Sequence, residues 1–128
     1  MREPVRLDAL GQVSMPISDV ARSTAFYRDQ LGLAHLYTFG ELAFFDCGGT
    51  RLFLTAAAEA PRPPSASGLY FSVTDIRAAH RDLGARGVVF EDEPHVIHVH
   101  PDGTEEWMSF FRDPDGNLLA LMSRESPG

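Results

Sequence analysis

The sequence is short of several features, and each shortage excludes a class of protein. It contains no lysine, so its eleven basic residues are all arginine, and eighteen acidic residues bring the formal net charge to −7. This negative balance argues against nucleic acid or an anionic membrane surface as a partner. The single cysteine, Cys47, excludes an internal disulfide and is compatible with the reducing cytoplasm.

Long apolar segments are also missing. No apolar run approaches the ~20 residues that a membrane-spanning helix needs, and the opening MREPVRLDAL lacks the apolar core of a signal peptide. We therefore expect a soluble, cytoplasmic protein. A chain of 128 residues is long enough for one core but short for two, which predicts a single domain over 1–128.

What is present is a pattern that occurs twice. The segment 17–20 reads ISDV, and the segment 73–76 reads VTDI. An alternating strand precedes each aspartate, and apolar residues at helical spacing follow it. Asp19 and Asp75 are therefore expected to cap the N-termini of two helices, which end at Gly32 and Gly87.

A second pair of segments completes the repeat. The stretch FFDCGGTRLFL (44–54) returns as FFRDPDGNLLAL (110–121), and both indicate a hairpin. Residues 57–67, rich in Pro, Ala and Ser, are expected to link module one (1–56) to module two (68–128). The predicted fold is α+β, with two tandem βαβββ modules that form a cupped, eight-stranded mixed sheet.

Each module has one helix, which covers one face of its sheet and leaves the other face to line a ligand cleft. Because side chains alternate along a strand, the strand residues divide into two sets. Those expected to pack under the helices are Val13, Met15, Ile17, Leu52, Leu54, Leu69, Phe71, Val73, Leu119 and Leu121. Those expected to face the cleft are Gln12, Ser14, Pro16, Arg51, Phe53, Thr55, Gly68, Tyr70, Ser72, Leu118, Ala120 and Met122.

The repeated strand-(I/V)-x-D-helix pattern resembles the vicinal oxygen chelate superfamily. The segments SDVARSTAFYRDQLGL (18–33) and DPDGN (113–117) carry this resemblance, which covers nearly the whole chain. Members of that superfamily include glyoxalase I, extradiol dioxygenases, methylmalonyl-CoA epimerase, fosfomycin-modifying enzymes and bleomycin resistance proteins. The resemblance implies a homodimer whose cleft lies near the subunit interface.

Metalloenzymes of that superfamily place a metal ligand on the first and the last strand of each module. Carried over to this sequence, these positions are Gln12, Phe53, Gly68 and Ala120. Only Gln12 has a side-chain atom that can ligate a metal, and one amide oxygen will not hold a hard divalent ion. The resemblance is therefore to the metal-less, bleomycin-resistance-like branch, and it implies no metal, no cofactor and no catalytic residue.

A cleft without a metal presents aromatic rings, which stack on planar ligands. Phe53 and Tyr70 face the cleft by alternation, and Trp107 lies on a neighbouring strand. By resemblance we expect a protein that sequesters a planar, largely aromatic natural product, as antibiotic-resistance members do. For any one aromatic residue, a place in the sheet core is the alternative. The other residues expected to contact the ligand are Gln12, Ser14, Arg51, His98, His100, Ala120 and Met122.

A different function is favoured by the histidines of DEPHVIHVHPDGTEEW, an insertion that the first module lacks. His98 and His100 share one face if this segment is a strand, and His95 precedes them. With Glu105 or Glu106 they could ligate a relocated divalent metal, or one imidazole could act as a general acid or base. This alternative is an enzyme of the lyase, isomerase or dioxygenase type. A solvated hairpin with no special role stays open as well.

Overall fold

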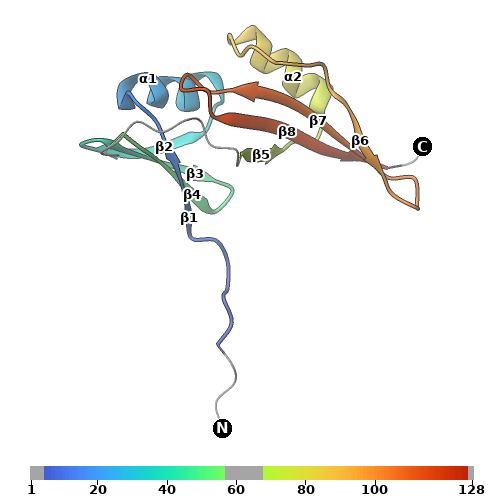
Figure 1. Ribbon diagram of the computed structural model, residues 1–128, viewed down its shortest axis with the longest axis horizontal. Coiled ribbons are helices and arrows are strands. Elements are labelled where there is room, and N and C mark those ends of the chain that lie inside the picture. The colour runs from blue at the N-terminus through green and yellow to red at the C-terminus, as the bar shows by residue number, and fades with distance from the viewer. Residues whose placement is uncertain (1–4, 57–67, 127–128) are drawn as a thin grey trace.

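The structure, a computed structural model, describes residues 5–56 and 68–126 (Figure 1). The predicted pair of βαβββ modules is confirmed, whereas the predicted linker 57–67 lies outside the described residues. The elements of the first module are β1 (Gln12–Pro16), α1 (Val20–Ala25), η1 (Phe26–Gln30), β2 (Ala34–Phe39), β3 (Leu42–Cys47) and β4 (Thr50–Thr55). The elements of the second are β5 (Leu69–Ser72), α2 (Ile76–Ala85), β6 (His95–Val99), β7 (Glu105–Arg112) and β8 (Leu118–Glu125).

The described strands form two four-stranded sheets, ordered β1-β4-β3-β2 and β5-β8-β7-β6. In each sheet the first strand of the module pairs in parallel with the last, and the other pairs are antiparallel. Both helices lie on the same side of the strands in Figure 1. Each sheet therefore has a helix-covered face and a helix-free face, which we call its open face.

The helices begin where the sequence predicts. The side chain of Asp19 accepts a hydrogen bond from the Arg22 amide at 3.0 Å, and Asp75 accepts one from the Ala78 amide at 3.1 Å. The glycines that follow, Gly32 and Gly87, have φ angles of +79° and +97°, a region that favours glycine. Among the described residues, no helix has the length and apolar character needed to cross a membrane.

The sequence did not predict that α1 continues as the π-helical turn η1. The Leu31 amide donates to the Phe26 carbonyl at 3.0 Å, one residue further back than in an α-helix. This turn brings Phe26 and Tyr27 inward, and both are buried.

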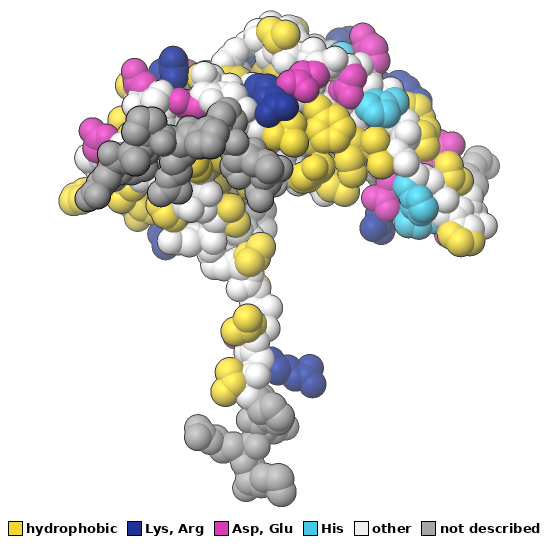
Figure 2. Space-filling view, in the orientation of Figure 1, with side chains coloured by type: hydrophobic (Ala, Val, Ile, Leu, Met, Phe, Trp, Pro, Cys, Tyr) yellow, Lys and Arg dark blue, Asp and Glu magenta, His cyan; other side chains and the backbone are white. Residues whose placement is uncertain are grey.

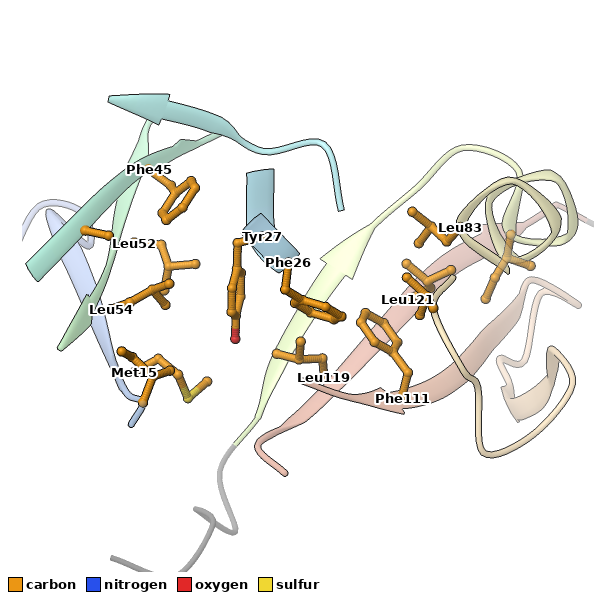
Figure 3. Packing of buried hydrophobic residues seen from close by; sticks show 14 residues of the cluster. Met15, Phe26, Tyr27, Phe45, Leu52, Leu54, Leu83, Phe111, Leu119 and Leu121 are labelled. Carbon is orange, nitrogen blue, oxygen red and sulfur yellow. The ribbon is translucent and has the colours of Figure 1, made fainter. Parts of the chain in front are cut away.

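One hydrophobic core runs through both modules on the helix-covered side (Figure 3). Figure 3 shows Phe26 and Tyr27 between the side chains of the first sheet and those of the second. Six of the residues expected under the helices are buried: Met15, Ile17, Leu52, Leu54, Leu119 and Leu121. The other four, Val13, Leu69, Phe71 and Val73, are half-buried.

The turn between β7 and β8 joins the second module to the first. The Tyr27 hydroxyl donates to Asp113 Oδ2 at 2.8 Å, and Asn117 Nδ2 donates to the Pro16 carbonyl, also at 2.8 Å. Asp115 accepts from the Ser18 amide at 3.0 Å. Since these bonds link residues far apart in sequence, they fix how the two sheets sit together.

Candidate functional site

Three aromatic rings lie side by side on the open face of the first sheet. Phe53 on β4 is in register with Phe44 on β3, and their ring centroids are 5.5 Å apart with planes 24° from parallel. Tyr37 on β2 stacks on Phe44 at 4.6 Å and 25°. We call Tyr37, Phe44 and Phe53 the aromatic row. Offset stacking of this kind is the favoured arrangement of aromatic rings.

The Phe53 end of the aromatic row has room beside it. The β1 residue in register with Phe53 is Ser14, whose side chain is small and exposed. Phe53 itself is only half-buried although it lies on an inner strand. A planar ligand can therefore stack beside Phe53 without displacing another ring.

A cation lies next to this row. The Arg51 guanidinium carbon is 5.4 Å from the centroid of Phe44, within the range of a cation–π interaction. Arg51 Nε also donates to Gln12 Oε1 at 3.2 Å. The structure thus brings together four residues expected to contact a ligand: Gln12, Ser14, Arg51 and Phe53.

The open face of the second sheet carries a smaller aromatic group. Tyr70 and Phe110 flank Ala120 in register, and their rings meet edge to face with centroids 6.1 Å apart. Ala120 is completely buried, so it offers no surface of its own, whereas Tyr70 is 47% exposed. Met122 lies one row further along the same face.

A polar cluster lies at the far end of that face. His98, Glu106 and Arg124 are in register across β6, β7 and β8. His100 Nε2 is 2.6 Å from Glu106 Oε2, and the rings of His98 and His100 are 4.5 Å apart. The hydrogen bond from His100 lowers the pKa of Glu106 below its usual value, with a smaller contribution from the charge of Arg124. Figure 2 shows histidine side chains gathered at the end of the molecule that carries β6.

Two of the residues singled out in the sequence do not join this cluster. His95 Nδ1 contacts the Glu93 carbonyl oxygen at 2.9 Å instead. Trp107 lies on the helix-covered face, where Arg77 of α2 sits 4.2 Å above its ring and Glu105 accepts from its indole N–H. Trp107 is therefore separated from the open-face residues by the sheet itself.

The sequence analysis did not identify Phe44 and Phe110 as open-face residues, and it left the facing of Tyr37 open. Phe44 and Phe110 could have been placed by alternation from their buried neighbours, Phe45 and Phe111. Tyr37 could not, because the register between β2 and β3 shifts between His35 and Tyr37.

The residues at the superfamily's metal positions do not fit a metal ion. Gln12 already accepts from Arg51, and Phe53 and Ala120 carry only hydrocarbon. A side chain at Gly68 has no room, because a Cβ there would lie 2.9 Å from the Leu118 carbonyl oxygen. Within residues 5–56 and 68–126, no group of three or more His, Cys, Asp or Glu side chains is arranged to hold a metal.

Comparison with known proteins places this geometry in a family. The family model described as Glyoxalase/Bleomycin resistance protein/Dioxygenase superfamily matches residues 9–121. The chain is 31% identical over 127 residues to the uncharacterized protein YraH of Bacillus subtilis (strain 168), covering 86% of this chain and 94% of that protein.

Two solved structures share the fold at lower identity. One is a lactoylglutathione lyase from Agrobacterium tumefaciens, with 23% identity, a TM-score of 0.69, and 91% of this chain and 94% of that chain covered. The other is a glyoxalase/bleomycin resistance protein/dioxygenase from Nocardioides, with 19% identity, a TM-score of 0.71, and 98% and 91% covered. At these identities the similarity concerns the fold alone.

Proposed function

Because the chain belongs to the Glyoxalase/Bleomycin resistance protein/Dioxygenase superfamily, we propose that it is a metal-independent binding protein of the bleomycin-resistance type. Its ligand is a planar, largely aromatic natural product, which it sequesters on the open face without changing it chemically. The observation that carries this proposal is the aromatic row. One of its rings, Phe53, occupies a position at which the superfamily's metalloenzymes have a metal-ligating side chain.

The energetics of the aromatic row favour a flat ligand. Each well-placed aromatic pair contributes roughly 0.5–1.5 kcal/mol beyond the burial of its area. Phe53 places hydrocarbon where a metalloenzyme has a polar metal ligand, so this surface attracts rings rather than ions. Such binding lowers the free concentration of an aromatic antibiotic, which would protect a cell if the protein acts in the cytoplasm.

The test is a titration with two planar tricyclic probes of opposite charge, proflavine and anthraquinone-2-sulfonate. We expect binding of at least one probe at one equivalent, with proflavine favoured by the net charge of −7. Phe53→Leu keeps an apolar side chain but removes the ring, so it should weaken binding about two- to tenfold. Isothermal titration calorimetry measures the change, and mass spectrometry of the released probe shows whether it was altered.

Phe90→Leu is the matched control. Phe90 packs against His80 and Phe111, which lie on the helix-covered side, so losing its ring leaves the aromatic row intact. The proposal is contradicted if the two variants bind the probes equally well. A chemically altered probe would contradict sequestration and favour the second candidate function.

The second candidate is an enzyme that uses the His100–Glu106 pair. A carboxylate that accepts from one imidazole nitrogen fixes the ring and stabilises its protonated form, as in general acid–base catalysis. The 2.6 Å contact and the lowered pKa of Glu106 are the observations that favour this candidate.

A solved structure of similar fold is described as a lactoylglutathione lyase, so the hemithioacetal of methylglyoxal and glutathione is the first substrate to test. An enzyme using this pair would form the thioester, and His100→Asn would reduce its turnover by at least about a hundredfold. His95→Asn is the control, because His95 lies outside the pair. No turnover, or turnover equal in both variants, would contradict this candidate.

A further inference from the structure

The two modules meet at Gln30 and Arg86 through a reciprocal pair of hydrogen bonds, the arrangement expected of two repeats related by an approximate twofold axis. These residues occupy the same place in the two copies of the repeat. Gln30 Nε2 donates to the Arg86 carbonyl at 3.1 Å, and Arg86 Nη1 donates to the Gln30 carbonyl at 3.3 Å. The symmetry creates two equivalent junctions. In the first, the turn 113–117 meets α1 and β1; in the second, the turn 46–50 meets α2 and β5.

The first junction is closed by polar contacts. The Tyr27 hydroxyl donates a hydrogen bond to Asp113, and the Ser23 hydroxyl donates one to Asp115 at 3.3 Å. The Asn117 side-chain amide donates to the Pro16 carbonyl. Tyr27 is completely buried as a result. The hollow that remains there is about 350 Å³, and charged residues, including Glu91, Arg112 and Asp113, border it.

At the second junction, neither the helix nor the facing turn carries the polar side chains that bridge the first junction. The repeat places Leu83 where the first module has Tyr27, and Ala79 where it has Ser23. The facing turn is one residue shorter and presents Cys47 and Gly48 instead of aspartates. In the part of the chain that the structure describes, no side-chain hydrogen bond joins this turn to α2 or β5.

A cavity of about 560 Å³ occupies the second junction. Its size is in the range of pockets that hold small molecules. Its apolar lining comes from the end of η1 and its following loop, β5, α2, β7 and β8: Leu31, Leu33, Phe71, Val73, Ala79, Leu83, Phe111 and Leu121. Walls from so many elements suit a compact molecule better than a segment of another protein.

Two charged side chains border this cavity at the C-terminal end of α2. Asp82 lies in the last turn of the helix, and Arg86 is the C-cap that follows it. Arg86 is held in place by its bond to the Gln30 carbonyl, which uses only one of its guanidinium nitrogens. The two side chains therefore offer an acceptor and donors to one end of a ligand.

We propose that this cavity is a second ligand site, separate from the aromatic row, for a compact apolar molecule with one polar end. Its apolar part fills the space at the second junction that is equivalent to the space occupied by Tyr27 and its partners at the first. Its polar end meets Asp82 and Arg86. Tyr70 also borders the cavity, but no residue of the aromatic row does, so the site is distinct from the surface that carries the proposed function.

The test uses N-phenyl-1-naphthylamine, a neutral apolar fluorophore with one N–H group. We expect it to bind at one equivalent with a rise in fluorescence. Ala79→Leu and Leu83→Phe each place extra carbon in the cavity, so either should weaken binding at least about tenfold. Ala85→Leu makes the same kind of change at an exposed position of α2 that does not border the cavity, so it is the matched control and should leave the affinity unchanged. Circular dichroism and thermal unfolding identify which variants are folded.

Cys47 supplies a readout on the unchanged protein. It is the only cysteine, it lines the cavity, and burial raises the pKa of its thiol. Saturating fluorophore should slow alkylation of Cys47 by iodoacetamide at least about fivefold. The proposal is overturned if the fluorophore does not bind, if it leaves alkylation unchanged, or if Phe53→Leu abolishes binding while the filling variants do not. Protection that rises with protein concentration alone would show that a second copy covers the site, which also overturns it.

Discussion

At the scale of single residues, Tyr27 and Asp113 show how a buried polar pair is tolerated in this core. Asp113 is nearly buried, yet both of its oxygens accept hydrogen bonds, from the Tyr27 hydroxyl, from Asn117 and from the Asp115 amide. Burial raises the pKa of Tyr27 far above its ordinary value of 10.0, and the nearby Asp113 carboxylate raises it further.

This pKa shift predicts how stability depends on pH. Above pH 10 the tyrosine of the unfolded chain loses its proton, whereas Tyr27 keeps its proton in the folded chain. Because the folded state then binds more protons, the free energy of unfolding should fall by about 1.4 kcal/mol per pH unit. Tyr27→Phe should remove this contribution, and urea unfolding between pH 8 and about pH 11 measures it.

Tyr70→Phe is the control for this prediction, because it removes the hydroxyl of a half-exposed tyrosine and leaves the Tyr27–Asp113 hydrogen bond in place. The Cys47 thiol, whose pKa is also raised by burial, contributes a slope of the same sign in every variant. Parallel stability curves for the protein and Tyr27→Phe would contradict the assignment to Tyr27.

At the scale of elements, local chemistry explains where α1 and α2 begin and where η1 and α2 end. The capping aspartates and the terminal glycines act through backbone groups a few residues away, so their effect could be predicted from sequence alone. The π-helical turn could not, because it depends on Phe26 and Tyr27 packing against the other module.

The cap of α2 offers a direct test. Asp75→Ala removes the acceptor of the Ala78 amide and should lower the free energy of unfolding by about 1 kcal/mol, as measured by urea unfolding. Asp75→Asn keeps an acceptor oxygen, so it should cost clearly less. Equal losses in the two variants would show that the negative charge of Asp75, rather than its hydrogen bond, stabilises the helix.

Strand alternation was sufficient for the inner strands but not for β2 and β6. Each of these edge strands carries a register shift, between His35 and Tyr37 in β2 and between Val96 and His98 in β6. A shift of one residue moves the following side chains to the other face. For this reason the sequence could not predict that His100 pairs with Glu106 or that Tyr37 lies on the open face.

At the scale of the whole molecule, residues 5–11, which lead into β1, extend away from the rest of the protein, and we call them the arm. Figure 2 shows exposed hydrophobic side chains along the arm. Val5, Leu7 and Leu10 are 92%, 96% and 71% exposed. Exposed apolar residues also gather on β6, at Val96, Ile97 and Val99. Surfaces of this kind are typical of contacts between proteins.

We therefore expect the homodimer that the superfamily resemblance implies, with these surfaces near the interface. Sedimentation equilibrium should give twice the chain mass at micromolar concentration, and the double variant Leu7→Asp/Leu10→Asp should shift the protein toward monomer. Val89→Asp is the matched control, since Val89 is equally exposed but lies on the loop after α2. A monomeric protein, or a dimer unaffected by the arm variant, would contradict this expectation.

The amino-acid sequence by itself determined the two βαβββ modules of this protein and the starts of their helices. It did so because caps, turns and alternation act over a few residues, and because the repeat marks where each module begins. The tertiary structure alone decided that Tyr37, Phe44 and Phe53 stack in one row and that Trp107 lies beneath α2. It also decided that polar side chains bridge one of two equivalent junctions while the other keeps a larger, mainly apolar cavity, since that outcome depends on how residues from distant segments fill a shared space.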